Sequence, residues 1–209
     1  MVRLLHPAVR AAGALGLLLM ACACASPPPP APPPPAPAPS PTSRGPILQV
    51  EQLDRGVLIV LPSVVLFDVN KSTFNMVEAG PYLERVARLL TTKTDKRVAV
   101  EGHTDSDGGA ALNDALSKAR AGAVAEALSA RGVAAARVAT AGFSFNRPVA
   151  SNATEDGKRL NRRVEIIVLD EKVANLAAGE PEGSFESAFA RLRQMVESGL
   201  VKPAEATKP

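Results

Sequence analysis

The residues best suited to ligand chemistry gather in residues 102–108, which read Gly-His-Thr-Asp-Ser-Asp-Gly. This segment follows a short apolar run and precedes a long alanine-rich stretch. The end of a strand ahead of a helix is where α/β sheets place their binding crevice. Aspartates in that position also bond the free backbone amides of a helix as caps. We therefore interpret Asp107 as a helix cap and Asp105 as a candidate functional carboxylate.

A second group of candidate residues repeats at helical spacing within the alanine-rich stretch. Asn113, Leu116 and Arg120 lie three and four residues apart and share one helix face. That face meets the sheet, where a buried arginine is costly unless a carboxylate partners it. Arg120 then either forms a structural salt bridge with Asp105 or extends its charged head to solvent. The alternative is that the two charges bracket a ligand carrying an ammonium and a carboxylate group.

A third cluster, residues 158–165, is basic and enters an apolar run. Strand alternation places Arg163 and Glu165 on one face and Arg162 on the other. Such a basic edge prevents strands of different molecules from pairing. The same arginines can also reach an anionic ligand at the end of the sheet, so both interpretations stay open.

Catalysis and nucleic-acid binding are poorly supported. Apart from His6 near the N-terminus, His103 is the one histidine, so neither a His-Asp-Ser relay nor a zinc site of familiar spacing can be assembled. No phosphate-cradling glycine motif is present. Near-balanced charge, +3 in total, with six Phe and one Tyr argues against a nucleic-acid partner. We expect no catalytic residue, no metal and no cofactor.

Strands and helices must alternate to position these clusters. Residues 57–61, 97–101, 137–142 and 163–169 have the apolar, β-rich composition of strands, and residues 64–67 form another short apolar run. Residues 76–90 and 110–131 have the pattern of helices, the second ending at Gly132. This order predicts an α/β (α+β) two-layer sandwich in which helices pack on one face of a small mixed sheet.

The N-terminal part predicts a tether. Residues 1–21 have the basic start and apolar run of a secretory signal. Residues 19–22, Leu-Met-Ala-Cys, resemble a bacterial lipobox, so we expect lipidation at Cys22; Cys24 and plain secretion are the alternatives. Residues 22–46 form a linker, and 11 of residues 26–41 are proline. In the polyproline conformation, the 24 residues 23–46 span on the order of 75 Å at about 3.1 Å per residue.

We expect residues 47–170 to form the globular domain and residues 171–209 to form a tail. Residues 171–178 suggest a short helix. Residues 185–199 suggest an amphipathic one with Phe185, Phe189, Leu192 and Val196 on a single stripe.

Several motifs together resemble the OmpA-like C-terminal domain. They are Phe-Asp-Val-Asn-Lys-Ser at residues 67–72, Glu-Gly-His-Thr-Asp at 101–105, Leu-Asn-Asp-Ala-Leu-Ser at 112–117 followed by Arg120, and Asn-Arg-Arg-Val-Glu at 161–165. The similarity extends over residues 57–169 in the family's order and spacing. With the lipobox, the chain is similar to peptidoglycan-associated (Pal-like) lipoproteins. Leu112, where the family usually has tyrosine, and the Phe-Ser-Phe run at 143–145 depart from the family pattern.

The resemblance implies non-covalent binding of peptidoglycan through the diaminopimelate of its stem peptide. In that family the residues equivalent to Asp105 and Arg120 grip the zwitterionic end of the ligand. By the same motif matching, the pocket would be lined by Asn70, Thr104, Asn113, Leu116 and Arg162.

The resemblance also implies an outer-membrane lipoprotein whose domain lies in the periplasm and tethers the membrane to the wall, with Tol-type or other envelope proteins as further candidate partners. The alternatives are an adaptor that binds envelope proteins through its C-terminal helix, and a cell-wall hydrolase that uses Asp105 or Asp107.

Overall fold

A computed structural model describes residues 45–68 and 71–204 of the 209-residue chain. The expected signal segment, the lipidation at Cys22 or Cys24 and most of the linker lie outside the described residues, as does Asn70. No helix among the described residues is long and apolar enough to cross a bilayer.

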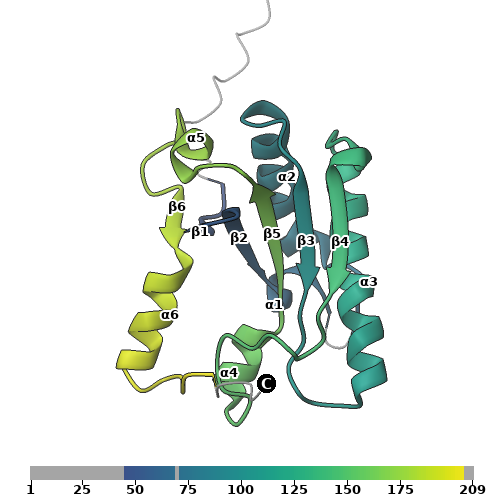
Figure 1. Cartoon of the computed structure of the whole chain (residues 1–209), viewed down its shortest axis with the longest axis vertical. Coiled ribbons are helices and arrows are strands. Elements are labelled where there is room, and N and C mark those ends of the chain that lie inside the picture. Colours follow the sequence, from purple (N-terminus) through teal and green to yellow (C-terminus); the bar gives the residue numbers. More distant parts are fainter. Residues whose placement is uncertain (1–44, 69–70, 205–209) are drawn as a thin grey trace, which may run out of the picture. The chain divides into compact units, whose positions relative to one another are not determined.

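A six-stranded mixed sheet forms one layer of the domain (Figure 1). The strands are β1 (Leu48–Leu53), β2 (Gly56–Pro62), β3 (Val98–Gly102), β4 (Val138–Gly142), β5 (Arg163–Leu169) and β6 (Phe185–Ser187). Their order across the sheet is β4-β3-β5-β2-β1-β6. The pairs β3–β4 and β1–β6 are parallel, and the other three are antiparallel.

Helices α2 (Met76–Thr92) and α3 (Ala110–Ser129) form the second layer, on the core side of the sheet. The other helices are α1 (Ser63–Leu66), α4 (Glu155–Asn161), α5 (Val173–Ala177) and α6 (Ala188–Glu197), with a 3₁₀ turn at Ala135–Arg137. The core lies between the sheet and α2 and α3, where Leu83 and Val124 pack with alternate strand residues such as Ile59 and Ile166. Each such side chain contributes about 1.5–3 kcal/mol when fully buried. The predicted two-layer α/β fold is confirmed.

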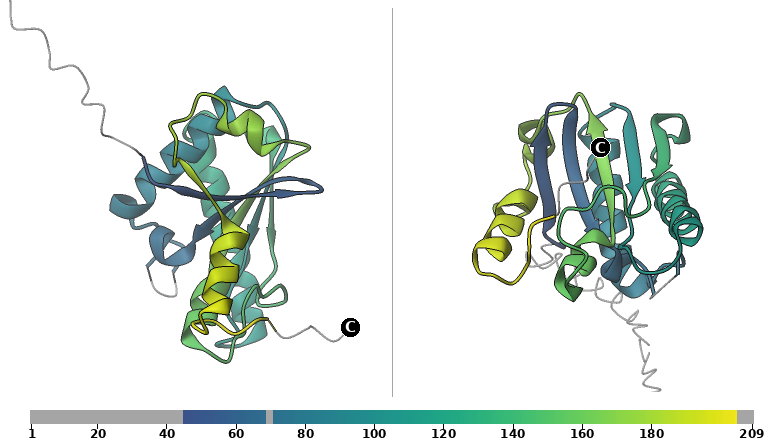
Figure 2. Two further views of the ribbon diagram at one scale, coloured as in Figure 1. Left: turned by 90° about the vertical axis from the view of Figure 1, so that its left-hand side faces the viewer. Right: turned by 60° about the horizontal axis from the view of Figure 1, so that its bottom comes forward.

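Helix α6 lies beside the β1 end of the sheet (Figures 1 and 2). A groove of about 260 Å³ is lined by Ala188, Leu192 and Met195 of α6 together with Gln49 and Val60 of the sheet. Gln49 and Val60 pair in register and alternate with the core residues Leu48 and Ile59, so the groove opens on the face opposite the core.

Strand β1 and helix α4 lie where the sequence predicted no strand or helix. Strand β1 contains Gln49, Glu51 and Gln52 between its apolar residues, so it lacks a continuous apolar run. The seven-residue helix α4 replaces an expected loop. It begins because the Thr154 hydroxyl accepts a hydrogen bond from the amide of Gly157, 3.1 Å away.

The predicted start of the last helix is wrong. Residues 185–187 form β6, in which Phe185 pairs with Leu48, instead of the first turn of a helix. Helix α6 begins at Ala188 because the Ser187 hydroxyl accepts a hydrogen bond from the Ala190 amide at 3.0 Å. The short apolar run at residues 64–67 lies mostly in helix α1.

Gly102 sets the distance between the sheet and α3. A Cβ atom at this position would overlap with the backbone carbonyl oxygen of Ser117 on α3. The helix backbone therefore lies directly on the end of β3. This contact brings the polar face of α3 next to the loop that follows β3.

We predict that Gly102→Ala destabilises the fold by about 1–3 kcal/mol, because the added methyl group forces two backbones apart. Gly122→Ala is the matched control, since a Cβ there meets nothing within 4 Å. In the interior of α3, this change should stabilise the fold by about 0.5–1 kcal/mol. Urea unfolding of both variants measures the difference; equal effects of the two substitutions would contradict the close-packing argument.

Candidate functional site

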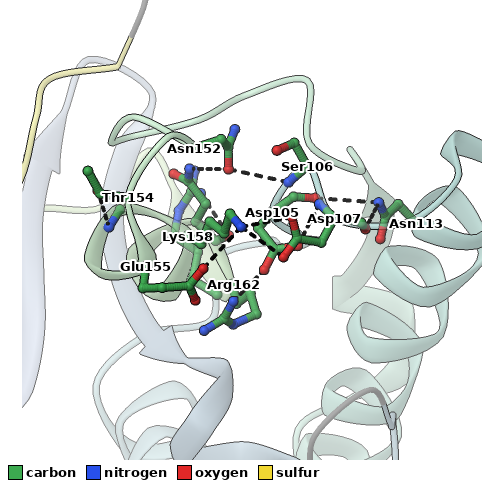
Figure 3. Close-up of polar contacts among 12 residues, drawn as sticks. Asp105, Ser106, Asp107, Asn113, Asn152, Thr154, Glu155, Lys158 and Arg162 are labelled. Atoms are coloured by element: carbon green, nitrogen blue, oxygen red, sulfur yellow. Dashed lines mark hydrogen bonds and ion pairs between the residues drawn. The ribbon is translucent and has the colours of Figure 1, made fainter.

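The candidate site lies where the loop after β3 faces α4 (Figure 3). Asp105 is 7% exposed, and both of its carboxylate oxygens have partners. Oδ1 accepts a hydrogen bond from the Asp107 amide at 3.1 Å, and Oδ2 pairs with Nη1 of Arg162. The carboxylate is thus held in one orientation before any ligand arrives.

Arg120 is buried on α3, with 3% of its surface exposed. Its Nε donates to the Lys71 carbonyl at 3.0 Å, and its guanidinium lies 5.3 Å from the centre of the Phe67 ring. Within the described residues, its two terminal nitrogens have no hydrogen-bond acceptor. Burial lowers the pKa of Arg120, the nearby charge of Arg162 lowers it further, and Asp105 raises it. The charges of Arg162 and Asp105 therefore both act on Arg120.

The interpretation of Arg120 as a structural salt-bridge partner of Asp105 is wrong. The arginine that pairs with Asp105 is Arg162, at the C-terminal end of α4. Arg120 instead lies over the Phe67 ring, and the charges of Arg162 and Asp105 are close enough to shift its pKa. Because a buried guanidinium stays charged in proteins, it suits a bidentate anionic partner.

The remaining predicted site residues support this pair in different ways. Asn113 donates from Nδ2 to the backbone carbonyls of Asp107 at 2.8 Å and Asp105 at 3.4 Å, so it fixes the loop. Thr104 is buried, and its hydroxyl has no hydrogen-bond partner within the described residues. Leu116 is half-buried on the same face of α3 as Arg120.

Asp107 is not a helix cap, contrary to the sequence-based interpretation. The N-cap position of α3 is Gly109, and no side chain caps the helix there. The Asp107 carboxylate instead pairs with Nζ of Lys158 at 2.9 Å, and Lys158 also binds Glu155 at 3.1 Å. The hydrogen bonds to Asp107 and then Glu155 raise the pKa of Lys158.

Two ion pairs therefore join α4 and its C-terminal end to the loop that follows β3. Lys158 lies on α4 and Arg162 directly follows the last residue of this helix; they reach Asp107 and Asp105 respectively (Figure 3). Sequence analysis placed Lys158 in a basic cluster but assigned it no contact with the aspartate loop, because no helix was expected there. The clue that was available is Thr154, followed by two acidic residues, which is typical of a helix start.

A second polar cluster lies on the sheet around His103. The donor atoms of Glu101, His103 and Glu165 lie within 4.8 Å of one another, as in a metal site. Both carboxylates are already bonded to arginines, however: Arg55 lies 2.8 Å and Arg147 3.3 Å from Glu101, and Arg163 lies 2.7 Å from Glu165. Three guanidinium groups beside two carboxylates disfavour a metal cation here.

His103 is neutral in the folded protein. It is 1% exposed, and neither ring nitrogen has a hydrogen-bond partner within the described residues. Burial lowers its pKa from 6.5 to about 3, with further lowering by Arg163, Arg147 and Arg55. Its 3.8 Å approach to Glu165 is therefore no ion pair at neutral pH.

Comparison with known proteins reveals relatives of this domain. The model of the OmpA family matches residues 66–162, which include Asp105, Arg120 and Arg162. The probable lipoprotein YiaD of Escherichia coli is 41% identical over 123 residues, which cover 59% of this chain and 56% of YiaD. The peptidoglycan-binding protein ArfA of Mycobacterium tuberculosis is 49% identical over 86 residues, which cover 41% of this chain and 26% of ArfA. The chain thus spans little more than half of YiaD and about a quarter of ArfA.

A solved structure is similar in fold and sequence. The cell wall anchor of the T6SS from Pseudomonas aeruginosa is 35% identical, with a TM-score of 0.54. The match covers 58% of this chain and 87% of that one.

The buried His103 predicts a specific acid sensitivity. Because its folded pKa of about 3 is below 6.5, the unfolded chain binds a proton that the folded chain excludes between these pH values. The stability associated with neutral His103 is fully present above pH 6.5 and is lost as the pH falls toward 3. The free energy of unfolding should fall by up to about 1.4 kcal/mol per pH unit from this group alone.

Urea unfolding of the wild type and His103→Gln at several pH values tests this expectation. Glutamine does not titrate, so the variant should lose stability less steeply in this window. Parallel pH profiles for the two proteins would show that His103 does not carry the effect.

Proposed function

Because the chain belongs to the OmpA family, we propose that it binds peptidoglycan non-covalently through the diaminopimelate of the stem peptide. Two relatives support a role at the wall: one is named a peptidoglycan-binding protein and another a cell wall anchor. The single observation that carries the proposal is the pair of opposite charges, Asp105 and Arg120, buried on adjoining elements of one site.

The chemistry of the pair suits an amino-acid zwitterion. The Asp105 carboxylate accepts hydrogen bonds from the ligand's ammonium group, and the terminal nitrogens of Arg120 donate to its carboxylate. Asn113 and Arg162 hold the aspartate loop in place in the absence of ligand. Affinity gains from such preorganisation because few side chains must be ordered on binding.

The site is suited to binding and not to hydrolysis. A general acid and base must exchange protons with the substrate. Here Asp105 is engaged by Arg162 and Asp107 by Lys158, so neither carboxylate stands free as a catalytic base. We infer a binding module without enzymatic activity.

The N-terminal part gives the binding domain its place in the cell. We propose that lipid at Cys22 anchors the protein in the outer membrane and that the proline-rich linker lets the domain reach the wall in the periplasm. The similarity to the probable lipoprotein YiaD supports this arrangement. Repeated stem peptides in the wall then add avidity to the affinity of a single site.

Co-sedimentation of the purified full chain with isolated sacculi tests the proposal. We predict that Asp105→Ala and Arg120→Ala each weaken binding about 10- to 100-fold, since each removes a charge-assisted hydrogen-bonding group. Free meso-diaminopimelate should displace the wild type. Asp114→Ala and Lys118→Ala are matched controls, because these residues pair with each other on α3 at 2.8 Å and are half exposed or more. Both controls should bind as the wild type does.

Binding that persists in both site variants would contradict the proposed pocket. Release of soluble fragments from the sacculi by the wild type would favour a hydrolase instead.

A further inference from the structure

The chain after α6 returns to the loop that precedes α4, next to the candidate site. Residues 199–204, here called the C-terminal strap, run from the end of α6 to α4 (Figures 1 and 2). Val201 is 2% exposed, and its amide donates to the Met195 carbonyl at 3.1 Å. The Lys202 carbonyl accepts from the Ser151 amide at 3.0 Å, and Pro203 forms an antiparallel bridge with Ala150.

The loop that the strap contacts, residues 149–152, is bonded to both α4 and the aspartate loop. The buried Asn161 of α4 accepts from the amides of Val149 at 2.8 Å and Ala150 at 3.1 Å. It also donates to the Ala150 carbonyl at 2.8 Å and to Oδ1 of Asn152 at 2.9 Å. The same Asn152 oxygen accepts from the Ser106 amide at 3.3 Å, next to Asp105 (Figure 3).

Helix α4 lies directly on the residue that the strap holds. A Cβ atom at Gly157 would overlap with the Ser151 carbonyl oxygen, so the helix has no room to approach closer. The Ser151 amide faces the strap. The backbone of Ser151 is therefore fixed between the strap and α4, the helix that carries Lys158 and Arg162.

The helix that precedes the strap, α6, is fixed to the sheet at its N-terminus. Strand β6 pairs with β1, and the Glu51 carboxylate of β1 accepts from the Ser187 hydroxyl at 2.6 Å and from the Phe189 amide at 3.1 Å. These bonds hold the N-terminus of α6, whose positive end favours a carboxylate. The strap thus connects an anchored helix to loop 149–152.

We propose that the C-terminal strap is a positioning element of the wall-binding site: it holds loop 149–152 and, through it, seats α4 so that Arg162 and Lys158 keep the aspartate loop in its binding geometry. The strap lies beyond residues 66–162, which the OmpA family model matches. What the site binds rests on the proposed function, whereas the coupling of strap to loop rests on the contacts above.

The test compares two truncations of the full chain, one after Ser198, which removes the strap, and one after Ala204, which retains it. Val201→Asp disrupts the buried contact with a single change, and Val201→Ile is the conservative counterpart. Hydrogen–deuterium exchange of residues 103–109 and 149–162 reports the positioning without any ligand. Affinity for meso-diaminopimelate reports its consequence, and thermal unfolding confirms that each variant is folded.

We expect truncation after Ser198 and Val201→Asp to speed exchange in both segments and to weaken diaminopimelate binding about three- to tenfold in a folded protein. Truncation after Ala204 and Val201→Ile should match the wild type. Unchanged exchange in both strap-disrupting variants would overturn the inference, as would faster exchange with unchanged affinity. If the intact chain does not bind diaminopimelate, the proposed function fails, and the exchange result alone still decides for or against the strap.

Discussion

A buried aspartate that must be paired on both oxygens is the constraint on which the site depends. Burying an ionised carboxylate without partners is prohibitively costly, so the fold has to supply donors to Asp105 from other elements. It does so with the Asp107 amide from the loop itself and with Arg162 from α4. Asn113 then fixes the backbone of the same loop from α3. Helices α3 and α4 are thereby both bonded to the loop that carries Asp105.

The scaffold meets this constraint through close backbone contacts. Gly102 lets α3 lie on the end of β3, and Gly157 lets α4 lie on the Ser151 backbone. Both contacts bring a helix close enough for short polar side chains such as Asn113 and Asn161 to bond backbone groups of the neighbouring loop. Interiors this closely packed transmit small displacements, which is why residues far from Asp105 matter to its geometry.

The sequence predicted the parts that follow from local pattern. Apolar composition and periodicity located strands β2, β3, β4 and β5 and helices α2 and α3, and helical spacing placed Asn113 and Arg120 on one face. It missed β1 because polar residues interrupt its apolar ones, and it missed α4 because seven residues show no helical period.

The partner of Asp105 was beyond sequence reasoning for a different reason. Spacing within α3 made Arg120 the obvious candidate, but the ion pair formed with Arg162, 57 residues away on a helix that was not expected. The strap contacts likewise join Ser151 and Lys202, which share no local pattern. Long-range pairings of this kind depend on how elements pack, which a single sequence does not specify.

The domain has two clusters of acids and arginines, and they differ in how completely their charged groups are paired. This difference explains why only one of them is a candidate site. Around His103, every carboxylate oxygen that bonds does so with a guanidinium group, and the imidazole is buried and neutral. The charges of that cluster are paired with one another, so its role is to stabilise the sheet. At the candidate site, two arginines, Arg120 and Arg162, lie near the single carboxylate of Asp105. Within the described residues, only the Nε of Arg120 donates a hydrogen bond to the protein. A buried cation whose terminal donors have no acceptor among the described residues favours an incoming carboxylate, because binding a carboxylate gives those donors a partner.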